Sequence, residues 1–182
     1  MALIIETGAG VENADSYIEL LDARTFAANY GLKLSDDDVA AEVTLRQAYL
    51  HLAIYEPELQ GKRTTNTQNN IYPRTGVLSN CVAVDGNSIP ESIKQAQVYA
   101  ASSIQEGYAT NNIDNGQALS SFSLDGVISE SYQAGSKTKL NNTIQGVQNS
   151  IYPLTKVGFY ASPCGTGGSN TLSRDDYFYG DC

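Results

Sequence analysis

The sequence has few of the residues on which nucleophilic or metal-assisted catalysis depends. His51 is the single histidine, and it falls inside a predicted helix, so we expect a helix-face residue rather than a general base. The three cysteines, Cys81, Cys164 and Cys182, form no C-x-x-C pair, which argues against a zinc site. Their odd number also argues against a disulfide framework and fits a reducing compartment.

Nucleotide-binding and hydrolase motifs are missing as well. The chain has no Walker A, no G-x-S-x-G and no G-x-G-x-x-G in a strand–helix context. Paired carboxylates occur only at a helix start or near the terminus, where capping or solvation explains them. We therefore expect no catalytic residues, no metal and no cofactor, and a protein that is not an enzyme.

Charge is scarce and unevenly distributed. Charged residues make up 17% of the chain, so Asn, Ser, Thr, Gln and Tyr must cover much of the surface, a composition common where protein meets protein. Ordinary compositional bias would explain the same numbers. The net charge is −9, of which −8 lies in residues 1–60. Without a Lys/Arg cluster the chain is a poor candidate for holding phosphate backbones, but like charges suit a passage through which DNA slides.

Long apolar runs are also missing. No stretch approaches the roughly 20 apolar residues of a membrane span, and the N-terminus has no basic region ahead of an apolar one. We therefore expect a soluble protein that is made in the cytoplasm and does not contact a membrane.

Helical periodicity predicts a mainly α fold. A first helix is expected from about Leu20, with Gly31 as its C-cap. A second helix is expected from the N-cap Ser35 to about Tyr55. Two apolar stripes run along this second helix, so it is contacted on both sides, either by its own bundle or by a neighbouring subunit. One stripe is Val39, Val43, Leu50 and Ile54, and the other is Ala41, Leu45, Ala48 and Leu52.

A third helix has the strongest local signal. Residues 88–91 read as a capping box with Pro90 in the first turn, and the helix is expected to end near Gly107. Its small side chains allow another helix to approach closely. They lie on a face formed by Ile93, Ala96, Ala100 and Ile104.

The second half of the chain changes character. Asp125-Gly126 between two short apolar runs predicts a β-hairpin near residues 121–132. Residues 161–182 are too rich in Gly, Ser and Asp to form a core of their own, but they contain Tyr177, Phe178 and Tyr179. Such aromatics favour an arm that orders on a partner over a disordered tail. We expect a helical domain at 1–132, a C-terminal extension or arm at 133–182, and a small helical bundle with a short β-hairpin as the fold.

Several short motifs resemble one family of phage proteins. They are Ser16-Tyr17-Ile18 followed by Asp22-Ala23-Arg24-Thr25-Phe26, the turn Tyr72-Pro73-Arg74-Thr75-Gly76, Ile89-Pro90 followed by Ile93-Lys94-Gln95-Ala96-Gln97, and Gly126-Val127-Ile128-Ser129 through Tyr132. Together they resemble the tailed-bacteriophage head–tail connector adaptors, or head completion proteins, often labelled DnaT-like single-stranded-DNA-binding proteins. The resemblance covers roughly residues 1–132.

The resemblance implies a structural virion protein of the neck, assembled in the host cytoplasm. It implies a homo-oligomeric ring, typically a dodecamer, between the portal protein above and tail or nozzle proteins below, with DNA passing through the lumen without specific binding. On this reading inter-subunit or portal contacts come from Tyr72, Arg74, Tyr177, Phe178 and Tyr179. The ring-interface helix faces come from Leu45, Leu52, Ala96 and Ala100.

Two other functions stay open. A single-stranded-DNA-binding module needs a basic groove with stacking aromatics, and Tyr72 with Lys62, Arg63 and Arg74 is the cluster that resembles one. The competing interpretation of that cluster is a turn whose Arg bonds carbonyl groups and whose Tyr packs inward. Another tail-completion protein is the third possibility.

Overall fold

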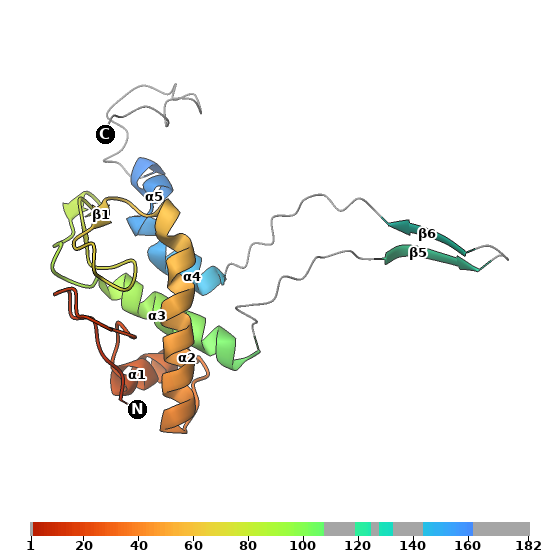
Figure 1. Cartoon of the computed structure of the whole chain (residues 1–182), viewed down its shortest axis with the longest axis horizontal. Coiled ribbons are helices and arrows are strands. Elements are labelled where there is room, and N and C mark those ends of the chain that lie inside the picture. The colour runs from red at the N-terminus through yellow and green to blue at the C-terminus, as the bar shows by residue number, and fades with distance from the viewer. Residues whose placement is uncertain (1, 108–118, 125–127, 133–143, 162–182) are drawn as a thin grey trace.

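The computed structural model describes residues 2–107, 119–124, 128–132 and 144–161. Within these ranges the fold is mainly α, as the sequence predicts (Figure 1). The helical elements are α1 (Leu20–Tyr30), α2 (Asp38–His51), the 3₁₀ segment η1 (Leu52–Glu58), α3 (Glu91–Gln105), α4 (Gln145–Ile151), the 3₁₀ segment η2 (Tyr152–Leu154) and α5 (Lys156–Ala161). The strands are β1 (Lys62–Arg63), β2 (Arg74–Thr75), β3 (Leu78–Ser79), β4 (Val82–Ala83), β5 (Leu119–Leu124) and β6 (Ile128–Tyr132).

Helix α3 is the centre of the core. Its most extensive contacts are with α2 and α4, and it also packs against α1. Small buried residues such as Ala96 and Ala100 let these helices approach closely. At α4, a Cβ on Gly146 would come within 2.6 Å of the Tyr99 ring, so the two helices meet where only glycine fits. The Phe26 ring of α1 contacts Tyr99 edge-on, with 5.8 Å between ring centroids.

The helix ends confirm one predicted cap and correct two. Gly31 caps α1 in the left-handed region at φ 67°, as expected. The N-cap of α2 is Asp37, whose carboxylate accepts from the Ala40 N–H at 2.9 Å, rather than Ser35. Pro90 occupies the N-cap of α3 without a side-chain cap bond, and the Ser88 hydroxyl donates to the Asp85 carbonyl at 3.0 Å. The capping box read from the sequence is therefore not formed.

The hydrophobic core extends past residue 132. Helix α4 and segment η2 fall in the stretch expected to be a C-terminal extension, yet they supply four core residues, Ile144, Val147, Ile151 and Leu154. Gln60 ties this stretch to the rest of the chain, since its side-chain amide donates to the Thr155 carbonyl at 3.0 Å. The expected aromatic arm around Tyr177, Phe178 and Tyr179 lies outside the described residues.

The strands form three two-stranded antiparallel pairs, β1–β2, β3–β4 and β5–β6. The last pair, with Leu124 opposite Ile128, confirms the predicted hairpin, and it lies away from the helices in Figure 1. Cys81, in the turn between β3 and β4, is disulfide-bonded. This bond contrasts with the expectation that the cysteines stay reduced.

Candidate functional site

The Tyr72–Gly76 turn faces the interior of the protein. Arg74 is almost fully buried and donates to three backbone carbonyls: Nε to Gln60 at 2.8 Å, Nη2 to Gly61 at 2.9 Å and Nη1 to Ile71 at 3.3 Å. Tyr72 is fully buried, joined to Pro73 by a cis peptide bond. Of the two interpretations of this turn, the structure therefore has the one in which Arg bonds carbonyl groups and Tyr packs inward. Tyr72 and Arg74 hold the chain to itself, which corrects their expected role as contacts to another subunit or a portal.

Glu56 neutralises the basic side chains beside this turn. Its carboxylate accepts from Arg63 Nε at 2.6 Å and Nη2 at 2.5 Å, and from Arg74 Nη1 at 3.5 Å. The hydrogen bonds from Arg63 hold the pKa of Glu56 below its usual value. Since Arg63 and Arg74 are engaged within the protein and Lys62 alone of the three bases is exposed, the cluster does not form a basic groove with a stacking aromatic.

The other motifs of the resemblance meet at one buried glutamine. Gln97 of α3 is fully buried, and its carbonyl accepts from the Tyr17 N–H at 2.8 Å. Its amide donates to the Ser16 hydroxyl at 3.0 Å and to the Leu45 carbonyl of α2 at 2.9 Å. The Tyr17 hydroxyl in turn accepts from the Tyr72 N–H at 3.0 Å. Hydrogen bonds among Tyr17, Tyr72 and Gln97 therefore connect three of the short motifs, those at residues 16–18, 72–76 and 93–97.

The predicted ring-interface faces are inside the chain. All four residues are fully buried in the core where α2 packs against α3: Leu45, Leu52, Ala96 and Ala100. They are not accessible to a second subunit. The sequence left open whether this stripe packs against the protein's own bundle or against a neighbouring subunit. The structure shows that it packs against the protein's own bundle.

The opposite stripe of α2 and η1 is exposed and apolar. We call it the outer stripe: Val39, Val43, Leu50 and Ile54. Between 44% and 71% of each of these side chains is accessible to water. The sequence revealed the stripe through its spacing, but the expected interface was assigned to the other side of the helix. Exposed apolar side chains at helical spacing make this face a candidate surface for a protein contact.

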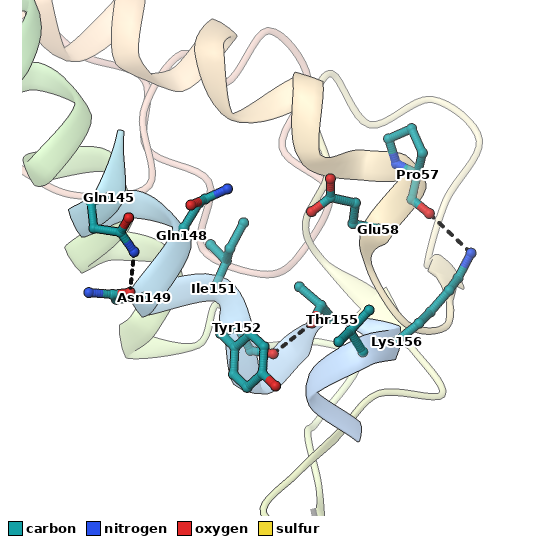
Figure 2. Close-up of a pocket in the computed structure, with 10 residues that line it drawn as sticks. Pro57, Glu58, Gln145, Gln148, Asn149, Ile151, Tyr152, Thr155 and Lys156 are labelled. Atoms are coloured by element: carbon teal, nitrogen blue, oxygen red, sulfur yellow. Dashed lines mark hydrogen bonds between the residues drawn. The ribbon is translucent and has the colours of Figure 1, made fainter. Parts of the chain in front are cut away.

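A groove opens between η1, α4 and α5 (Figure 2). Its volume is about 520 Å³. It is lined by Pro57, Glu58, Gln145, Gln148, Asn149, Ile151, Tyr152, Thr155, Lys156 and Val157. Lys156 Nζ crosses one end to donate to the Pro57 carbonyl at 3.1 Å. No local pattern predicted this groove, because its walls come from distant parts of the chain, and the Lys156–Pro57 hydrogen bond joins residues 99 positions apart.

His51 lies near the end of α2. Its ring is buried on α2 and meets the Tyr55 ring edge-on, with 6.1 Å between the ring centroids. Burial lowers the pKa of His51, which favours the neutral ring near pH 7. Across the described ranges, no group of three His, Cys, Asp or Glu side chains is placed to hold a metal ion.

The described helices include none with the length and apolar character needed to cross a membrane. The fold and surface define a small, mainly α protein with a buried hydrogen-bond network around Gln97 and several exposed apolar side chains. The chain belongs to the family described as "Putative DnaT-like ssDNA binding protein", whose model matches residues 1–174. No match was found among curated proteins or among solved structures. The family agrees with the DnaT-like label of the resemblance, and the connector role stays a prediction.

Proposed function

We propose that this protein is a structural assembly subunit, a head–tail connector adaptor that forms a ring between the portal and the tail of a tailed bacteriophage. The observation that carries the proposal is the outer stripe on α2 and η1. Four large apolar side chains at helical spacing stay accessible to water, although the same helix already buries its other stripe in the core. Burial of such a stripe against another chain removes it from water and favours association.

The charge of the protein supports a role in which DNA passes but is not held. The net charge is −9, and Arg63 and Arg74 are engaged by Glu56. An acidic lumen repels the phosphate backbone at long range, so DNA moves through it without adhering. A ring needs a heterologous interface, in which the outer stripe of one copy meets a different surface of the next.

The test is the mass of the full-length protein in solution by light scattering, alone and then mixed with its cognate portal protein. We expect a ring, or a stoichiometric complex with the portal. The double variant Leu50→Asp/Ile54→Asp should abolish that assembly, because each carboxylate would be desolvated in the interface. Val82→Asp on β4 is the matched control, since Val82 is 69% exposed against 71% for Leu50. A wild-type monomer that ignores the portal would overturn the proposal.

Single-stranded-DNA binding is the second candidate, and the description of the family favours it. It is separated from the first by measuring affinity for an oligonucleotide against salt. Each neutralised phosphate contributes about −0.7 to the slope of log affinity against log salt. A steep slope would support the DNA-binding function, whereas no measurable binding at low salt would remove it. Binding to tail components without binding to the portal would point to another tail-completion role.

A further inference from the structure

The groove between η1, α4 and α5 suits an aromatic occupant that also carries polar groups. Ile151 lies fully buried beneath it, while Tyr152 and Val157 present exposed apolar surface at its edge. The polar groups around it include amide side chains, among them Gln148, and one charge of each sign, Lys156 and Glu58. A site of about 520 Å³ falls in the range that binds compact ligands, roughly 300–1,000 Å³.

The chain itself contains a segment of this chemistry. Tyr177, Phe178 and Tyr179 follow Asp175 and Asp176, and Asp181 comes shortly after. Aromatic side chains bury large apolar areas, and tyrosine hydroxyls pair with amide groups such as those at the groove edge. The flanking residues Arg174, Asp175 and Asp176 carry charges of both signs, as the groove does with Glu58 and Lys156. We propose that the groove is the docking site for the Tyr177–Tyr179 segment of the same chain.

The length of the connection favours the segment's own chain over a second copy. Lys156 and Val157, which line the groove, belong to α5, and α5 ends at Ala161. The fifteen residues 162–176 that follow can span roughly 50 Å. A covalent connection of this length holds its end at an effective concentration on the order of millimolar, above that of a second copy in dilute solution. The entropy lost when a connection of this length brings its ends together is little more than that lost by a shorter one.

The test uses the absence of tryptophan from the sequence. Phe178→Trp in the full-length chain creates a single fluorescent probe on the segment. We expect a blue-shifted emission and protection from a soluble quencher, as for an indole removed from water. Adding Val157→Asp should return both signals to those of an exposed indole. Leu21→Asp on α1, a still more exposed apolar position outside the groove, should leave them unchanged.

Several outcomes would overturn the proposal. An exposed indole in the Phe178→Trp protein would do so, and so would a blue shift that Val157→Asp does not change. A blue shift lost on strong dilution would assign the groove to a second copy instead. If Val157→Asp lowers the helical circular dichroism, Tyr152→Ser replaces it as the groove variant. The experiment needs no portal, so its failure would leave the adaptor proposal standing.

Discussion

The two apolar faces of α2 have the same chemistry and opposite surroundings. The inner stripe, Ala41, Leu45, Ala48 and Leu52, is fully buried against the rest of the chain. The outer stripe, Val39, Val43, Leu50 and Ile54, remains between 44% and 71% exposed. A single helix can thus stabilise the fold with one side and offer the other to a partner. Hydrophobic spacing finds both stripes but does not say which one the fold covers.

Polar as well as apolar contacts fix the orientation of α2. The Leu45 carbonyl accepts from the buried amide of Gln97 on α3, so the inner face is held by a directional bond as well as by packing. Asn70 also donates its side-chain amide to the Tyr49 carbonyl of α2. Rotating the helix to bury the outer stripe would break these bonds and leave buried groups unsatisfied.

The largest effect on stability is expected from shortening a side chain of the inner stripe. Leu45→Ala should lower the free energy of unfolding by about 3–4 kcal/mol, because it leaves a cavity in a close-packed core. The urea midpoint of the full-length protein measures this. A loss below about 1 kcal/mol would show that the inner stripe is less tightly packed than the structure describes.

A slightly smaller loss of stability is expected when the polar contact between α2 and α3 is removed. Gln97→Leu should cost about 2–3 kcal/mol, since the Tyr17 N–H and the Leu45 carbonyl each lose their buried partner. Gln95→Leu, at a half-buried position of the same helix, is the matched control and should change stability little. Equal urea midpoints for the two variants would contradict the role assigned to Gln97.

The inner face should also respond to acid through His51, the single histidine of the chain. Burial lowers its pKa in the folded state, so the unfolded chain binds more protons below about pH 6.5. Stability is therefore complete above that pH and is lost as pH falls from it through the folded-state pKa. The slope cannot exceed about 1.4 kcal/mol per pH unit for one proton. Urea midpoints from about pH 8 to pH 5 test this.

The control for the acid response is His51→Gln, which removes the titrating ring. The variant should lose the component of the pH dependence centred near neutral pH while keeping any response at lower pH. A wild-type protein equally stable across that interval, or a variant with an unchanged profile, would show that His51 does not contribute.

The smallest effect on folding is expected from the outer face. Leu50→Ser should change the free energy of unfolding of the monomer by no more than about 0.5 kcal/mol, because the side chain is already mostly in water. The same urea measurement tests it beside Leu45→Ala. A loss comparable to that of Leu45→Ala would mean that part of the chain outside the described residues covers the outer stripe.

Local patterns predicted the elements well and their exact caps poorly. The first helix with Gly31, the third helix and the hairpin strands follow from periodicity and turn residues close in sequence. At the start of α2, several adjacent side chains are all able to cap, and the backbone selects Asp37 over Ser35. Before α3, the Ser88 hydroxyl donates to the Asp85 carbonyl, and the helix has no side-chain cap bond. Such choices depend on geometry that residue type alone does not define.

The groove and the hydrogen bonds between the motifs could not be predicted from local sequence patterns. Residues 16–18, 72–76 and 93–97 stood out as a set through the resemblance, yet nothing in their spacing indicated that they bond to one another. The Tyr17–Gln97 hydrogen bond joins residues 80 positions apart, and the Gln60–Thr155 bond joins residues 95 apart. Contacts at this separation leave no periodic signal in the sequence.

Local patterns were enough to predict the mainly α class, the positions of the principal helices and the two stripes of α2, because helix formation depends on residues three and four positions apart. Packing between distant segments sets the rest: Leu45 and Leu52 face inward, Tyr72 and Arg74 are buried, and α4 contributes to the core. Those outcomes depend on which distant surfaces fit together closely and satisfy each other's hydrogen bonds.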